Sequence, residues 1–142
     1  MTRYQLIIIT KEVALQYYQT EDKLYRLFLD YHQAYEWARP LLEKQIYYIT
    51  EPLLYPYFIS TLHNDLQKAG FQKKNRYTYT RARTGSSIYL DDREVIFDHA
   101  GDAKEEWQVF DCFKKVSPYF FAVNMKKETY GWLKPLKVYS VL

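Results

Sequence analysis

Apolar residues follow a helical spacing in the first half of this chain and strand-like runs in much of the second half. A short, isoleucine-rich run over residues 3–9 predicts a buried strand. Residues 11–18 place apolar side chains four apart, which predicts a short helix, and the clearest three- and four-residue spacing follows over residues 24–35. Thr20 precedes that second helix, so we expect it to act as the N-terminal cap.

Two more helices are expected before the spacing changes. Pro40 suits the first turn of a helix. Its core-facing residues are Leu42, Ile46 and Ile49. Pro56 lies near the start of the next helix, and Gly70 is expected to end it.

Strands dominate from residue 76 onward. Residues 76–81 are β-prone, and the apolar segments 88–90 and 94–97 flank an Asp-Asp-Arg turn, which predicts a hairpin. A last helix is expected after Gly101 and a final strand over residues 119–125. The apolar face of that helix is expected to contain Trp107, Val109, Phe110, Phe113 and Val116. We therefore predict an α+β fold, a single domain over residues 1–142, with a mostly antiparallel β-sheet of about five strands packed with four to five α-helices.

Tyrosine is unusually common in this chain, and aromatic residues make up 19% of it. A tyrosine-rich core and a tyrosine-rich contact surface both account for this composition. The single cysteine, Cys112, excludes a disulfide framework within the chain and favours a reducing compartment. The N-terminal apolar run is too short for a signal peptide or a membrane span, so we expect a cytoplasmic protein.

Charge is unevenly placed, although the net charge is only +3. The segment 67–84 carries basic residues and no acid. These basic residues are Lys68, Lys73, Lys74, Arg76, Arg81 and Arg83. With Tyr77 and Tyr79 they form a candidate nucleic-acid surface. Because an acidic segment follows at residues 85–106, charge pairing across the sheet is the favoured interpretation.

No catalytic or metal-binding pattern stands out. His32, His63 and His99 lie in different predicted elements, far from one another in sequence. Cys112 lies at the edge of an apolar helical stripe, as a small buried hydrophobe does. We expect no enzyme activity, no metal and no cofactor, and a protein that acts by docking onto another protein. An enzyme with a convergent site is one alternative.

Three segments resemble a known family. They are EKQIYYITEP at residues 43–52, FKKVSPYFFA at 113–122 continuing to YGWLKP at 130–135, and LFLDYH at 27–32. Together they resemble the sporulation inhibitor of replication family of spore-forming bacilli. The resemblance implies a non-enzymatic regulator that binds the N-terminal domain of the replication initiator DnaA and prevents new rounds of chromosome replication.

The resemblance also implies the residues of the docking surface. Carried over by position, they are Val13, Tyr17, Gln45, Tyr48 and Pro135. The family pattern has an aromatic residue at the position of Val13, so this chain departs from it there. The competing prediction is a nucleic-acid-binding module built from the basic, Tyr-rich segment 68–83.

Overall fold

An antiparallel sheet runs through the middle of the molecule, with helices on both of its faces. The computed structural model describes residues 1–53 and 55–134. Its helices are α1 (Lys11–Tyr17), α2 (Glu21–Gln33), α3 (Arg39–Ile49), α4 (Tyr55–Lys68) and α5 (Ala103–Lys114). Its strands are β1 (Thr2–Ile9), β2 (Thr50–Glu51), β3 (Gln72–Lys73), β4 (Thr78–Arg81), β5 (Ser86–Leu90), β6 (Val95–His99), β7 (Phe120–Asn124) and β8 (Thr129–Trp132).

The sheet confirms the expected α+β class but has more strands than expected. All of its pairings are antiparallel, in the order β3-β4-β5-β6-β1-β7-β8, and β2 pairs with the end of β1. The sequence predicted about five strands, whereas eight are present in the described residues. The three unassigned strands are β2, β3 and β8, which have two to four residues each and no apolar alternation long enough to be recognised.

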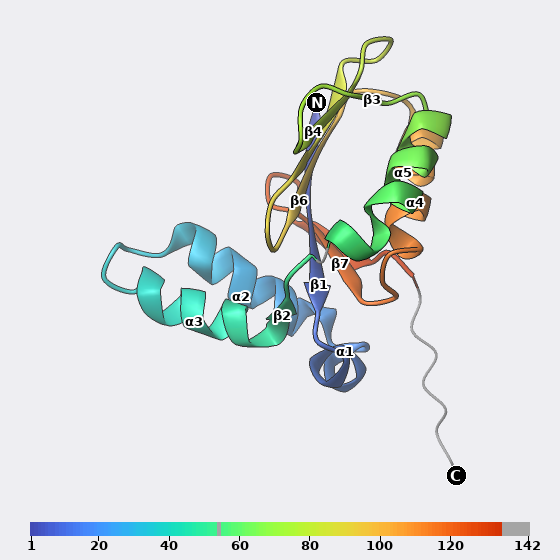
Figure 1. Ribbon diagram of the computed structural model, residues 1–142. Helices are drawn as coiled ribbons and strands as arrows, with labels where there is room; N and C mark the ends of the chain where they lie inside the picture. The colour runs from blue at the N-terminus through green and yellow to red at the C-terminus, as the bar shows by residue number, and fades with distance from the viewer. Residues whose placement is uncertain (54, 135–142) are drawn as a thin grey trace.

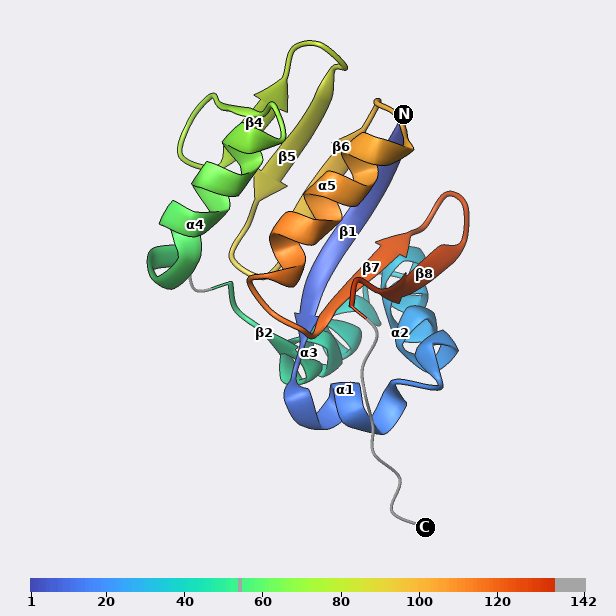
Figure 2. The same cartoon turned by 90° about the vertical axis from the view of Figure 1, so that its right-hand side faces the viewer.

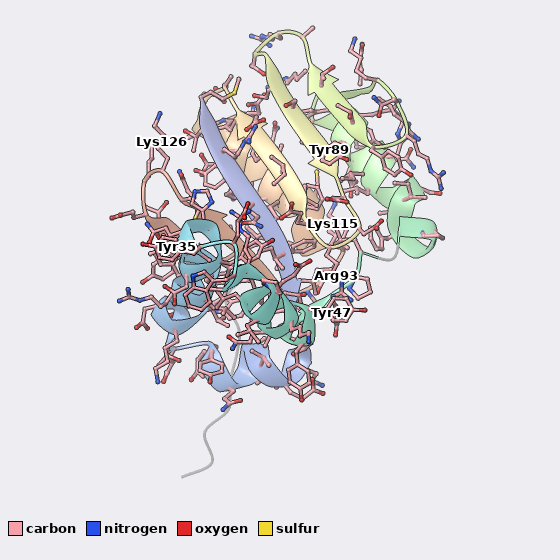
Figure 3. The ribbon with its side chains drawn as sticks, turned by 90° about the vertical axis from the view of Figure 1, so that its left-hand side faces the viewer. Tyr35, Tyr47, Tyr89, Arg93, Lys115 and Lys126 are labelled. Atoms are coloured by element: carbon pink, nitrogen blue, oxygen red, sulfur yellow. The ribbon has the colours of Figure 1, made fainter. Side chains whose placement is uncertain are left out.

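The helices divide between the two faces of the sheet. Figure 1 shows α4 and α5 along one face, with α2 and α3 on the other face and α1 at the lower end of the sheet. Figure 2, turned by 90°, shows α5 lying along β6 and β1, and α1 crossing below the end of β1. Helices α1–α3 cover only the part of their face formed by β1, β7 and β8, so the outer face of β4, β5 and β6 stays open (Figure 3).

Burial along the strands follows from this helix placement. In β5 and β6 buried and less buried residues alternate, because a helix covers only one face of these strands. Every residue of β7 is buried, and the last four residues of β1 are buried, because helices cover both of their faces. The isoleucine run of β1 therefore supplies two cores, with Leu6 and Ile8 in one and Ile7 and Ile9 in the other.

Local sequence signals account for most of the helix boundaries, with two corrections. Gly70 adopts a φ of +93°, as expected of a glycine that ends a helix, and Pro40 lies in the first turn of α3. Thr20 occupies the N-cap position of α2 but makes no side-chain capping hydrogen bond. Trp107 was predicted on the apolar face of α5, yet it is 62% exposed, because α5 turns Val109 and Phe113 toward the sheet instead.

Candidate protein-docking surface

Helix α3 carries two of the predicted docking residues on its exposed side. Ile46 and Ile49 pack against a cluster of buried residues formed with β1, β7, α1 and α2, which we call the second core. Its members are Ile7, Ile9, Ala14, Leu24, Tyr25, Phe28, Phe121 and Val123. Gln45 is exposed and Tyr48 is 82% exposed, so neither takes part in that packing. The sequence prediction that these two side chains point away from the core face of α3 is confirmed.

The opposite flank of α3 is tied to the sheet. The Arg93 guanidinium, in the turn between β5 and β6, lies 3.7 Å from the centre of the Tyr47 ring. Its Nη1 also donates to the carbonyl oxygen of Thr50 at 3.0 Å and to Thr50 Oγ1 at 3.2 Å. Figure 3 shows Arg93 and Tyr47 side by side, where α3 meets the hairpin. Tyr47 is thus committed to a contact within the fold, whereas its neighbour Tyr48 is not part of it.

A cleft opens beside this tether, between α2 and α3 on one side and the β5–β6 turn on the other. Its volume is about 490 Å³. Phe28, Ile7 and Ile46 contribute apolar lining, and Glu43, Asp92 and Glu94 contribute carboxylates. The Glu94 carboxylate accepts a hydrogen bond from the amide of Gln5 on β1.

Helix α1 starts where α3 ends. The backbone N–H of Thr10 donates to the carbonyl oxygen of Ile49 at 2.8 Å, which holds the beginning of α1 beside the last turn of α3. Val13 and Tyr17 are half-buried and pack against the second core, so each presents only part of its side chain outward. The two helices therefore lie at the same end of the sheet (Figure 2).

The end of β8 approaches α1 from the other side. The indole Nε1 of Trp132 donates to the carbonyl oxygen of Tyr18 at 3.4 Å, and Leu133 is buried in the core that α4 and α5 cover. Pro135, the fifth predicted docking residue, lies outside the described residues. That Val13, Tyr17, Gln45, Tyr48 and Pro135 form one contiguous surface stays a prediction.

A second group of polar side chains lies at the start of α5, where Glu105 binds several of the others. Glu105 is fully buried, although it is a carboxylate. It accepts hydrogen bonds from Thr84 Oγ1 and Ser86 Oγ, both at 2.6 Å. It also accepts from Arg81 Nη1 and from the backbone N–H of Gly101, both at 3.1 Å. A Cβ at position 101 would collide with this carboxylate, so only glycine allows the approach.

The electrostatics of Glu105 follow from these contacts. Burial acts to raise its pKa, but the hydrogen bonds from Ser86, Thr84 and Arg81 outweigh burial and hold the pKa below its usual value. A carboxylate that stays ionised and is fully hydrogen-bonded is a structural anion that fixes α5 to the β4–β5 turn. It is not a general acid poised near neutral pH.

Other candidate chemistry in the described part of the chain is limited. No group of three or more His, Cys, Asp or Glu side chains there is arranged to hold a metal ion. Cys112 is buried in the core under α5, and burial raises the pKa of its thiol to about 11, which keeps it protonated and unreactive. No described helix is long and apolar enough to cross a membrane.

The basic segment does not assemble into a stacking platform. Tyr79, one of its two candidate stacking residues, is fully buried, and its hydroxyl lies 3.0 Å from His63 Nδ1. Arg81 of the basic segment forms an ion pair with Glu105 of the acidic segment. This pair joins the sheet to helix α5, whereas the sequence predicted charge pairing between adjacent strands. Tyr77 remains 44% exposed, with Arg76 over its ring.

Sequence reasoning missed two exposed apolar residues near the beginning of α3, Trp37 in the turn that precedes the helix and Leu41 in its first turn. Trp37 is 78% exposed and Leu41 is 63% exposed. The available signal was their spacing, because residues 37, 41, 45 and 48 are separated by four, four and three positions, which places them on one side of a helix.

Comparison with known proteins gives two agreeing results. A protein family described as "Sporulation inhibitor of replication protein SirA" matches residues 2–137. The sporulation inhibitor of replication protein SirA of Bacillus subtilis (strain 168) is 30% identical to this chain over 143 aligned positions, which cover 94% of this chain and 94% of that protein.

Proposed function

Because this chain belongs to the sporulation inhibitor of replication family, SirA, we propose that it blocks the initiation of chromosome replication during sporulation by binding the N-terminal domain of the initiator DnaA. The observation that carries the proposal is the family match over residues 2–137, nearly the whole chain. The chain acts by occupying a surface of its partner, without catalysis and without a cofactor.

The exposed flank of α3 supports this mode of action. Tyr48 presents 82% of its surface to solvent from a helix whose opposite flank is fixed by Arg93. A tyrosine held on a rigid helix offers a large apolar ring and a hydroxyl at low conformational-entropy cost. Gln45 adds an adaptable amide one turn away. Val13, Tyr17 and Pro135 complete the proposed docking surface.

Titration of the purified initiator N-terminal domain with this chain tests the proposal. Tyr48→Ala is expected to weaken binding by about thirtyfold, since truncating a central interface anchor costs about 2 kcal/mol. Its melting temperature should stay close to that of the wild type, because the side chain is exposed. Tyr89→Ala, which removes a 45%-exposed tyrosine from the open face of β5, is the matched control and should bind normally.

Tyr17 needs a different pair of variants, because part of its ring packs against the second core. Tyr17→Ala should lower both stability and binding, whereas Tyr17→Phe keeps the packing and removes only the hydroxyl. Gln45→Ala should have a smaller effect than Tyr48→Ala unless its amide meets a buried charge. Absence of wild-type binding to the initiator domain, or equal binding by Tyr48→Ala and the wild type, would exclude the proposed surface.

A further inference from the structure

Large exposed apolar side chains concentrate around α3. In the part of the chain that the structure describes, eleven large hydrophobic residues are exposed, and five of them lie between positions 35 and 48. Those five are Tyr35, Trp37, Leu41, Tyr47 and Tyr48. Soluble proteins rarely keep several such side chains together without a partner for them.

Three of the five form one stripe. The N–H of Arg39 bonds to the carbonyl oxygen of Tyr35 at 3.2 Å, and the N–H of Leu42 bonds to that of Ala38 at 3.3 Å, so the turn before α3 already follows its helical path. At about 100° per residue, Trp37, Leu41, Gln45 and Tyr48 then fall within an arc of about 80°. This arc is centred about 110° away from the buried face of the helix.

The other two exposed residues lie off the stripe. Tyr47 faces the hairpin, where its ring carries Arg93 (Figure 3). Tyr35 precedes the helical turn, and Figure 3 shows it well apart from Tyr47. The stripe itself spans eleven residue steps, or about 16 Å of helix, which is a suitable length for one side of a small protein interface.

We propose that Trp37 and Leu41 are docking residues that extend the surface of Gln45 and Tyr48 along α3, so that the initiator domain meets an apolar stripe with Trp37 as its second anchor. This inference rests on the proposed function. Its occupant is the initiator domain because the stripe is continuous with Gln45 and Tyr48 on the same helix. The chemistry that fits the stripe is an apolar patch on the partner, with room for an indole ring.

Alanine variants at the two positions test the inference in the same titration. Trp37→Ala is expected to weaken initiator binding by about thirtyfold, since tryptophan is the most enriched residue among interface anchors. Leu41→Ala is expected to weaken it by about fivefold. Trp107→Ala is the matched control, because Trp107 is 62% exposed on α5, beyond the other face of the sheet, and should change binding less than twofold.

A charge variant keeps the test independent of folding. Leu41→Glu preserves helix propensity at an exposed position, so its melting temperature should match that of the wild type. It places a carboxylate in the apolar stripe and should abolish measurable binding.

The outcomes separate this inference from the proposed function. If the wild type binds, Tyr48→Ala weakens binding, and the Trp37 and Leu41 variants behave like Trp107→Ala, the inference is wrong and the proposed function stands. If the wild type does not bind, both are wrong. If sedimentation shows a dimer that Trp37→Ala dissolves while initiator binding is unchanged, the stripe joins two copies of this chain and the inference is again wrong.

Discussion

The two faces of the sheet differ in how completely they are covered. Within the described residues, the core between the sheet and helices α4 and α5 contains eighteen buried hydrophobic residues, among them Phe97, Phe113 and Phe120, and it extends along most of the sheet. The second core, under α1–α3, has eight such residues and ends at the open face of β4–β6. Polar groups follow the same division. On the first face Tyr79 has a hydrogen-bond partner and Glu105 has several, whereas in the second core the Tyr25 hydroxyl is buried with no partner among the described residues.

This difference indicates that one face mainly stabilises the fold and that the helices on the other face mainly present the proposed docking residues. The larger share of the apolar burial that stabilises the fold lies under α4 and α5, at about 25 cal/mol for each Å² removed from water. The helices on the other face bury less and expose more, and they carry the proposed docking residues. Substitutions should therefore separate into those that unfold the protein and those that change binding.

The largest expected effect comes from breaking the Glu105 network. Glu105→Ala removes the acceptor for Arg81, Thr84 and Ser86, leaves the largely buried Arg81 guanidinium without its carboxylate partner, and creates a cavity. Loss of a buried charged partner typically costs about 3–5 kcal/mol of unfolding free energy. Chemical denaturation of the wild type and of Glu105→Ala measures this loss of unfolding free energy. Asp98→Ala is the control, because it breaks the Arg3–Asp98 pair, whose arginine is 70% exposed, and it should cost about 1 kcal/mol or less.

The same network predicts a dependence on pH. The folded-state pKa of Glu105 lies below its ordinary value of 4.5, so the unfolded chain takes up the proton first as the solution becomes acidic. The stabilisation is complete above the ordinary pKa and is lost as the pH falls through the folded-state pKa. The wild type should therefore lose stability below about pH 4.5 more steeply than Glu105→Ala. Parallel curves for the two proteins would contradict this assignment.

The tether between α3 and the hairpin should have a smaller effect. Arg93→Ala removes the stacking on Tyr47 and two hydrogen bonds to Thr50, with an expected cost of about 1–2 kcal/mol. Arg93→Lys keeps the charge but loses the planar fork, so it should recover only part of the loss. Arg76→Ala is the control, since Arg76 lies over the exposed ring of Tyr77. Equal melting temperatures for the Arg93 and Arg76 alanine variants would show that the tether contributes nothing.

Sequence reasoning found the elements whose pattern is local. Three- and four-residue spacing identified α1, α2 and α3, and the Asp-Asp-Arg turn identified the β5–β6 hairpin. Helical spacing also placed Gln45 and Tyr48 on a different side of α3 from the core residues Ile46 and Ile49. These signals depend only on the period of the element.

What the sequence did not reveal depends on long-range contacts. The two-residue strands β2 and β3 exist because β1 and β4 pair with them, and their own residues carry no strand period. In the sequence Glu105 resembles an ordinary surface acid on a helix. It is buried because Thr84 and Ser86, at the β4–β5 turn, pack against it and donate hydrogen bonds to it. Trp107 was predicted to lie in the core but is exposed, because a wide apolar stripe in the sequence does not indicate which of its edges faces solvent.

One substitution in the second core should raise the stability of the protein instead of lowering it. Tyr25→Phe removes a buried hydroxyl that has no partner within the described residues and keeps the ring stacked on Tyr130 at 4.6 Å. It should stabilise the protein by up to about 1 kcal/mol, because the desolvation cost of the hydroxyl disappears. Tyr79→Phe, on the face covered by α4 and α5, removes a hydroxyl that lies 3.0 Å from His63 Nδ1 and should destabilise the protein by about 1 kcal/mol. Thermal unfolding distinguishes the two, and the same sign for both would contradict the contrast between the faces.

The smallest expected effect comes from the basic segment. Lys73, Lys74 and Arg76 are exposed in and beyond β3, at the edge of the sheet remote from α1 and α3. Replacing all three with Glu should change initiator binding less than twofold, because these side chains lie away from the proposed docking surface. Tyr48→Ala, measured in the same series, gives the scale of a real loss.

Two results would overturn this expectation. One is a loss of initiator binding by the triple variant as large as that of Tyr48→Ala. The other is tight binding of duplex DNA by the wild type that weakens steeply with salt, because neutralising several phosphates releases counterions and makes affinity fall with salt concentration. Tyr79 argues against the second result, because a ring fully buried beside His63 is not available for bases to stack on. The other candidate stacking residue of the segment, Tyr77, is 44% exposed and already has Arg76 over its ring, so it is only partly available to a nucleic acid.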